Sequence, residues 1–131
     1  KGQGAFLNDR PIHVSNARNM SDSLLATGFP YDIRERSNRI FEQFRTMLLA
    51  SRGVRRAGSA AIDMCYVASG RLDGLWEENL KPWDTAAGVV IVSEAGGRLS
   101  TCDGQAFTPS QQSLVACTPM IHGELVKALN G

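Results

Sequence analysis

Two short stretches of the chain contain residue types that can bind a phosphorylated ligand. The first holds the carboxylates Glu77, Glu78 and Asp84, which fall within eight residues. Carboxylate oxygens near a strand end and a helix start are the hard ligands that Mg²⁺ prefers. However, an aspartate just after Pro82, in the first turn of a predicted helix, often serves only as a cap. Trp83 fits either a wall of such a site or an aromatic anchor in the core, so both interpretations stay open on the residues alone.

The second stretch is Gly58-Ser59-Ala60, where a predicted strand runs through glycine into a helix. Unpaired N–H groups and the positive end of the helix dipole favour a phosphate or a sugar hydroxyl at such a junction. Glycine and alanine also let a ligand approach the backbone closely. Many strand-to-helix turns of small residues serve packing only, so the pattern does not by itself predict a ligand.

The remaining polar residues form no recognisable catalytic set. The chain has no GxSxG, HExxH, Walker or dinucleotide-binding motif. His13 and His122 lack partners at ligand spacing; we expect His13 to be structural and His122 to lie at the surface or cap a helix. The arginines at positions 34, 36 and 39 alternate with glutamates, which predicts a solvated helix face.

Helical and strand-like segments alternate along the chain, which predicts layered α/β architecture rather than a bundle or a sandwich. Residues 2–15 read as a hairpin with Asn8-Asp9 in its turn. The predicted helices cover residues 33–51, 60–69, 82 to the Gly96-Gly97 pair, and 124–129. The predicted strands cover residues 24–29, 54–57, 72–77, 98–101 and 114–117.

Composition restricts the class of protein and of partner. The chain has 131 residues, 43% of them hydrophobic, which suits one domain. A formal net charge of +1 argues against nucleic acid or an anionic membrane as a partner. Three widely spaced cysteines suggest reduced thiols in the cytoplasm, with Cys65 and Cys117 filling core space. No apolar run is long enough to span a bilayer.

Together with the segments around them, the two stretches resemble the inositol monophosphatase family of Mg²⁺-dependent phosphatases. Residues 83–88 (WDTAAG) and 94–97 (EAGG) match the C-terminal motif of the family in order and spacing. Residues 56–61 (RAGSAA), 66–68, 70–73 and 76–77 follow the family order upstream, and residues 4–8 and 25–29 resemble further family segments. The similarity covers essentially the whole chain.

The resemblance implies the C-terminal part of the layered αβαβα fold of these sugar phosphatases, with residues 1–131 as the C-terminal half. The family's other metal-binding motif, D-P-[IL]-D-G-T with an upstream glutamate, has no match in the chain. We therefore expect Lys1 to be a truncation point and the hairpin of residues 1–15 to belong to a sheet whose other strands are absent.

The resemblance also implies roles for the two stretches. Asp84 would ligate one Mg²⁺ and approach the inositol ring, Glu77 would accept a hydrogen bond from a ring hydroxyl, and the backbone of Gly58, Ser59 and Ala60 would contact the substrate. The activity implied is hydrolysis of inositol monophosphate or a similar sugar phosphate. Because no complete catalytic set lies in the chain, we expect it to be inactive alone, and we expect a homodimer.

Two alternatives stay open at this point. Fructose-1,6-bisphosphatase and 3′-phosphoadenosine phosphatases share similar motifs, although Glu77 and the Gly58 region favour an inositol phosphate. A non-catalytic α/β module for binding or oligomerisation is the alternative outside enzymes.

Overall fold

The chain forms a five-stranded sheet, four α-helices and a separate hairpin in the computed structural model, which describes residues 1–131. The strands are β1 (Phe6–Leu7), β2 (Arg10–Pro11), β3 (Leu24–Thr27), β4 (Gly53–Arg55), β5 (Gly74–Glu77), β6 (Arg98–Ser100) and β7 (Leu114–Cys117). The helices are α1 (Ile33–Ala50), α2 (Ala60–Ala68), α3 (Pro82–Glu94) and α4 (His122–Asn130). Two short 3₁₀ helices cover Met20–Asp22 and Pro119–Ile121.

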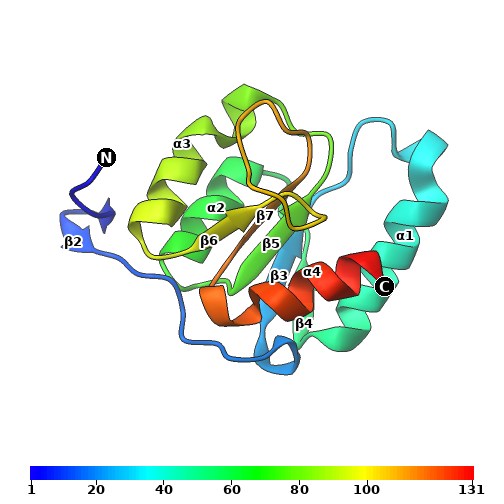
Figure 1. Ribbon diagram of the computed structural model, residues 1–131, viewed down its shortest axis with the longest axis horizontal. Coiled ribbons are helices and arrows are strands. Elements are labelled where there is room, and N and C mark those ends of the chain that lie inside the picture. The colour runs from blue at the N-terminus through cyan, green and yellow to red at the C-terminus, as the bar shows by residue number, and fades with distance from the viewer.

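The sheet has the order β4-β3-β5-β7-β6 and lies between two helical layers. β3 runs parallel to β4 and β5, whereas β7 is antiparallel to β5 and β6. Figure 1 shows α2 and α3 on one face of the sheet and α1 and α4 on the other. The arrangement confirms the layered α/β fold that the alternation of elements predicts.

Each face of the sheet has its own hydrophobic core, because side chains alternate between the faces of a strand. On β5, Leu75 packs into the core beneath α2 and α3, while its neighbour Trp76 packs into the core beneath α1 and α4. Leu114 and Val115 of β7 divide in the same way. The central strands are therefore apolar on both faces, which explains why they read as continuous apolar runs in the sequence.

The carboxyl ends of the parallel strands meet at one edge of the sheet. Thr27 at the end of β3 is paired with Trp76 of β5, and Thr27 Oγ1 donates a hydrogen bond of 2.7 Å to the Trp76 carbonyl. β4 ends at the same edge and leads into α2. Ligands of open α/β sheets bind outside such strand ends, so this edge is the first place to look for a site.

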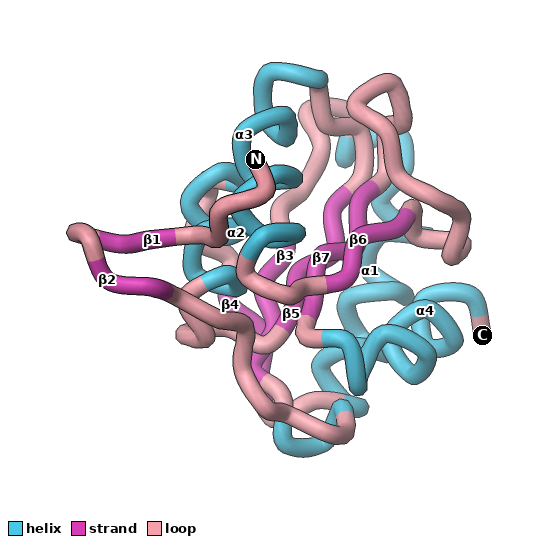
Figure 2. Tube along the Cα trace, turned by 60° about the vertical axis from the view of Figure 1, so that its left-hand side comes forward, coloured by secondary structure: helices cyan, strands magenta, loops and turns pink.

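The predicted hairpin is confirmed. β1 and β2 pair antiparallel, and Asn8 and Asp9 both have positive φ, as a two-residue type I′ turn requires. Figure 2 shows that the hairpin projects from the body of the molecule as a sheet of its own.

The amphipathic pattern of α1 is broader than the face that the helix buries. Ile40 and Met47 are buried, but the apolar residues that follow them, Phe41 and Leu48, are 56% and 45% exposed. Successive residues differ by about 100° around a helix. A face centred on Ile40 and Met47 therefore leaves the residues that follow each of them at its border with water.

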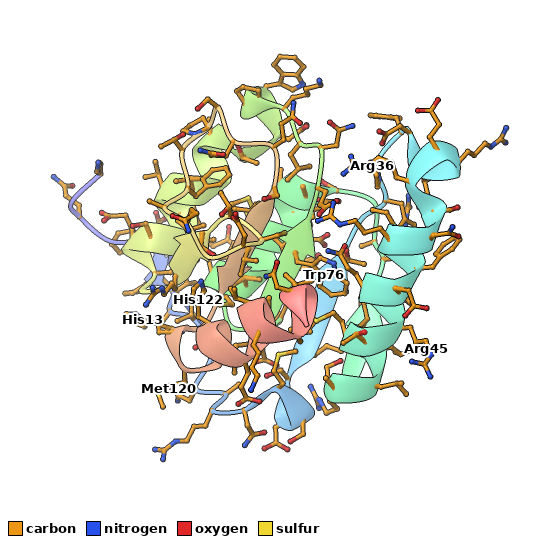
Figure 3. All side chains as sticks on the ribbon, turned by 45° about the vertical axis from the view of Figure 1, so that its right-hand side comes forward. His13, Arg36, Arg45, Trp76, Met120 and His122 are labelled. Atoms are coloured by element: carbon orange, nitrogen blue, oxygen red, sulfur yellow. The ribbon has the colours of Figure 1, made fainter.

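Two predictions about single side chains are wrong. Cys65 is exposed instead of filling core space, because α2 buries Asp63, Met64 and Val67 on its other side; Cys117 is buried as expected. His122 is buried rather than at the surface, and its Nε2 lies 2.8 Å from Ser100 Oγ (Figure 3). None of the helices has the length and apolar character to cross a membrane.

Candidate functional site

A cavity of about 330 Å³ lies beside the carboxyl ends of β3, β4 and β5, and every candidate residue from the sequence lines it. Four segments line it: the loop after β3, the β4–α2 junction, the end of β5 and the start of α3. The candidates are Gly58, Ser59, Ala60, Glu77 and Asp84. The two stretches found in the sequence therefore form one site, although they come from different elements.

The start of α2 forms one side of this cavity. Gly58 has a φ of +94°, a conformation that other residues rarely adopt. Ser59 is the N-cap of α2, and its Oγ accepts a hydrogen bond of 3.3 Å from the Ile62 N–H. The Ser59 hydroxyl is thus committed to the helix, whereas the first N–H groups of α2 have no partner within the helix. A ligand at this side meets backbone donors.

Glu77 is a partly buried carboxylic acid at the end of β5. Burial is the largest cause that raises the pKa of Glu77 to about 7, followed by the nearby charges of Asp63 and Asp84, while Arg56 acts in the opposite direction. Its Oε2 atom is buried without any hydrogen-bond partner. A carboxyl group in this state is readily protonated near neutral pH and can both donate and accept a hydrogen bond.

Asp84 occupies the first turn of α3, where it caps the helix and also faces the cavity. Its Oδ2 accepts a hydrogen bond of 3.0 Å from the Lys81 N–H, which caps the helix. The residue is partly exposed, lines the cavity, and has a second oxygen with no hydrogen bond from the protein. Capping therefore leaves one carboxylate oxygen for a ligand.

Trp83 is not a core anchor, because its side chain is 80% exposed. The chain turns from Asn79, whose φ is positive, into the first turn of α3 and places Trp83 in the lining of the cavity. Its interpretation as a wall of the site is the one that agrees with the structure.

Sequence reasoning missed Asp63, a fully buried carboxylic acid on α2. Only 1% of the residue is exposed, and both carboxylate oxygens lack a hydrogen-bond partner. Burial raises the pKa of Asp63. One signal was available: Asp63 is the only charged residue in the otherwise apolar helix of residues 60–68. Gly28, which lines the cavity beside Glu77, carried no such signal.

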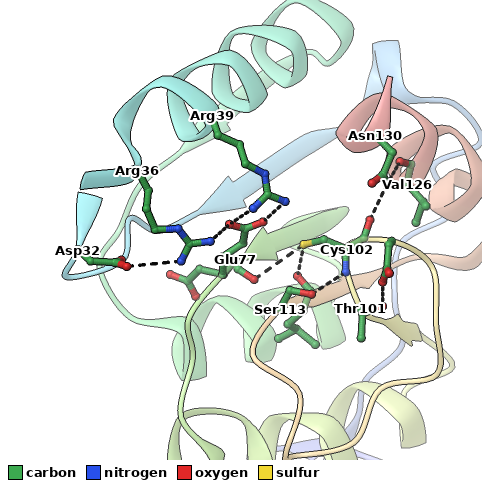
Figure 4. A network of polar contacts seen from close by, with 12 residues as sticks. Asp32, Arg36, Arg39, Glu77, Thr101, Cys102, Ser113, Val126 and Asn130 are labelled. Atoms are coloured by element: carbon green, nitrogen blue, oxygen red, sulfur yellow. Dashed lines mark hydrogen bonds and ion pairs between the residues drawn. The ribbon is translucent and has the colours of Figure 1, made fainter. Parts of the chain in front are cut away.

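Arg34 and Arg39 are exposed, as the predicted solvated face requires, but Arg36 and Arg39 also bind a buried carboxylate. Glu78 is buried at the end of β5; Arg36 Nη2 lies 3.0 Å from its Oε2 and Arg39 Nη2 lies 2.9 Å from its Oε1. Figure 4 shows this network, in which Asp32 also contacts Arg36. A buried carboxylate needs such partners, so the arginines turn toward the strand end and fix α1 to it.

The donor set for a metal ion is incomplete within residues 1–131. No three His, Cys, Asp or Glu residues come together closely enough to hold a metal ion. Asp84 offers one free carboxylate oxygen, which suits a hard cation such as Mg²⁺ as a single ligand. The residues present therefore fit part of a magnesium site.

The family model described as the inositol monophosphatase family matches residues 1–131. The chain belongs to this family. It is 48% identical over 126 residues to an inositol-1-monophosphatase from Synechocystis sp., which covers 96% of this chain and 44% of that protein. It is also 39% identical over 130 residues to a putative Nus factor SuhB from Neisseria meningitidis serogroup B, covering 99% of this chain and 50% of that protein.

A solved relative of the family confirms the predicted fold. The inositol monophosphatase from Anabaena (Nostoc) sp. superposes with a TM-score of 0.94 at 43% identity, over 98% of this chain and 53% of that one. The chain thus spans about half the length of these relatives.

Proposed function

We propose that the chain is the substrate-binding half of a Mg²⁺-dependent phosphomonoesterase that hydrolyses inositol monophosphate or a similar sugar phosphate. The observation that carries this proposal is the single cavity that joins Gly58, Ser59 and Ala60 with Glu77 and Asp84. Membership of a phosphatase family supports the reaction class.

Each side of the cavity has a distinct task in this proposal. The backbone of Gly58, Ser59 and Ala60 contacts the substrate at the helix start, where N–H groups point outward. Glu77 accepts a hydrogen bond from a ring hydroxyl. Asp84 holds one Mg²⁺ through its free oxygen and lies near the ring. When bound, Mg²⁺ ions neutralise phosphate charge, activate water and stabilise the leaving alkoxide.

The isolated chain is inactive in this proposal. Asp84 is one ligand, and the residues of the chain do not bring together a second and third one. The remaining ligands, and the residues that prepare the attacking water, come from polypeptide outside these 131 residues, of the D-P-x-D-G-T type.

We also propose that the protein works in the cytoplasm and pairs with a second copy. All three cysteines are free, and burial raises the pKa of Cys102 to about 11 and of Cys117 to about 12, which keeps them as inert thiols. Helices cover both faces of the five-stranded sheet, so we assign the contact with a second copy to α1, where Phe41, Leu48 and Leu49 are exposed.

The test is Asp84→Asn in the longer protein that contains this chain. We expect weaker Mg²⁺ binding and lower turnover of inositol 1-phosphate together, because one metal ligand loses its charge. Asp9→Asn is the matched control, since Asp9 lies in the hairpin turn, outside the cavity. Unchanged activity of Asp84→Asn at limiting Mg²⁺ would remove Asp84 from the metal site.

The same longer protein separates the three substrate types. We expect inositol 1-phosphate to be hydrolysed with a higher kcat/KM than fructose 1,6-bisphosphate or 3′-phosphoadenosine 5′-phosphate, because Glu77 and the Gly58 region face the ligand. Preference for either of the other two would move the proposal to a different branch of the superfamily.

A further inference from the structure

We infer that Gly28 is a positioning residue: its missing side chain makes the space in which the Glu77 carboxyl group lies, and thereby sets the selection for a ring hydroxyl. The inference rests on the proposed role of Glu77 in the site and adds a residue that sets substrate selectivity.

The space in which a side chain of residue 28 would lie is occupied by the Glu77 side chain. A Cβ atom built on Gly28 would overlap Oε1 of Glu77 and lie 2.7 Å from its Cδ and 3.4 Å from its Cγ. The three nearest atoms all belong to the Glu77 side chain. The φ angle of Gly28 is outside the left-handed region, so the backbone conformation does not require glycine. Glycine is required here because the Glu77 side chain lies so close to the backbone.

The pairing of two strands fixes this relationship. Thr27 is opposite Trp76 in the β3–β5 ladder, so the next two residues lie side by side: Gly28 directly after β3, and Glu77 as the last residue of β5. The hydrogen bond from Thr27 Oγ1 to the Trp76 carbonyl holds the two strand ends together. Gly28 therefore cannot move away from Glu77 without opening the edge of the sheet.

No polar contact within the protein holds the Glu77 carboxyl group in place. Its Oε2 atom is buried without a hydrogen-bond partner. Asp63 adds a nearby negative charge rather than a donor. A carboxyl group without hydrogen bonds is positioned by the shape of its surroundings. The Glu77 carboxyl group lies in the space that a side chain at position 28 would fill.

A methyl group at Gly28 should displace the carboxyl group without unfolding the chain. The overlapped atoms are the far end of a flexible side chain, so Glu77 changes rotamer while the backbone stays in place. Because both residues line the cavity, the displaced carboxyl group no longer meets a ring hydroxyl in the original geometry.

The test compares Gly28→Ala with Gly123→Ala in the longer protein, on two substrates. Gly123 lies in α4, and a Cβ there would meet nothing within 4 Å. For Gly28→Ala we expect kcat/KM for inositol 1-phosphate to fall about tenfold or more, mainly through KM, because an aligned hydrogen bond is lost. Hydrolysis of 4-nitrophenyl phosphate, which has no ring hydroxyl next to the phosphate, should change less than threefold. Equal loss on both substrates, or loss on neither, overturns the inference.

A double-mutant cycle tests whether Gly28 acts through Glu77. In a Glu77→Ala background, Gly28→Ala should cause little further loss on inositol 1-phosphate, because the group that it displaces is already gone. Additive losses overturn the inference.

A direct readout separates this inference from the proposed function. With ¹³C-labelled glutamate, the Glu77 carboxyl signal, assigned by Glu77→Gln, should shift in Gly28→Ala and not in Gly123→Ala. If neither substrate is hydrolysed by the parent protein, the proposed function fails, and this signal still decides the inference. An unchanged Glu77 signal in Gly28→Ala overturns it.

Discussion

At the scale of single residues, the site depends on carboxyl groups that are held in a poorly solvated place. Glu77 has a pKa raised to about 7, chiefly by burial and then by the charges of Asp63 and Asp84. Asp63 is buried with both oxygens unpaired. Groups of this kind lower stability and are retained where they act on a ligand, so their clustering at the cavity supports its assignment as the functional site.

The Glu77 carboxyl group should make stability depend on pH. Its pKa is higher in the folded state than the ordinary value of 4.5, so the folded chain binds more protons between these values. The free energy of unfolding should therefore fall as pH rises from about 4.5 to about 7, by about 3 kcal/mol at most. Urea unfolding at several pH values, compared between the parent chain and Glu77→Gln, isolates this contribution.

Glu77→Gln should lose that part of the pH dependence and should be more stable than the parent chain at pH 8. The amide mimics the neutral acid and cannot ionise. Parallel stability curves for the two chains between pH 4.5 and 7 would show that Glu77 titrates as an ordinary, solvated glutamate.

The sequence predicts these residues unevenly. Glu77 and Asp84 lie within family motifs, and Ser59 carries an ordinary capping pattern, so residue type and spacing are enough to mark them as candidates. Gly28 also lies in a segment that resembles the family, but its residue type does not indicate a role. That role depends on the pairing of β3 with β5, which brings together residues far apart in the sequence. The burial of His122 likewise depends on its contact with Ser100 of β6.

At the scale of elements, the start of α2 gives one side of the cavity its shape. Gly58 turns the chain, Ser59 caps the helix, and the following small residues keep the backbone accessible. The sequence predicts the elements themselves well, because their caps and turn residues agree with their periodicity. α3 shows the competition best: Val89 to Val92 alone favour a strand, but Pro82 and the packing of α2 on α3 keep the segment helical.

Loss of the α2 cap should lower the stability of the chain. We expect Ser59→Ala to reduce the free energy of unfolding by about 1 kcal/mol, because the Ile62 N–H loses its acceptor. Ser59→Thr keeps a hydroxyl at this position, so we expect it to retain most of the stability of the parent chain. Ser110→Ala, in an exposed loop, is the control. Chemical denaturation measures all three variants. Equal stability of Ser59→Ala and the parent chain would mean that the cap does not hold the helix start.

At the scale of the whole molecule, α1 presents a set of large apolar side chains to solvent. Phe41, Leu48 and Leu49 lie on this helix, and Leu49 is 71% exposed. Tyr31 in the preceding loop is fully exposed and also lines the cavity. An apolar set of this kind, next to a ligand site, is typical of an interaction surface.

Self-association should therefore depend on α1. We expect a dimer by light scattering at high protein concentration, and about tenfold or more weaker association for Leu49→Ser, because a buried leucine contributes more than about 1 kcal/mol. Met120→Ser is the control, since Met120 is similarly exposed but lies away from α1 (Figure 3). A monomeric parent chain at high concentration, or equal effects of the two variants, would contradict this assignment.

In the function that we propose, these 131 residues hold the substrate-facing half of a phosphatase site and only one ligand for its metal. The most direct test is the rate of phosphate release from inositol 1-phosphate by the purified chain at saturating Mg²⁺, with circular dichroism to show that it is folded and the longer protein as the active reference. We expect the purified chain to release phosphate no faster than buffer alone does. Turnover by the chain that requires Mg²⁺ and stops on addition of a chelator would contradict it.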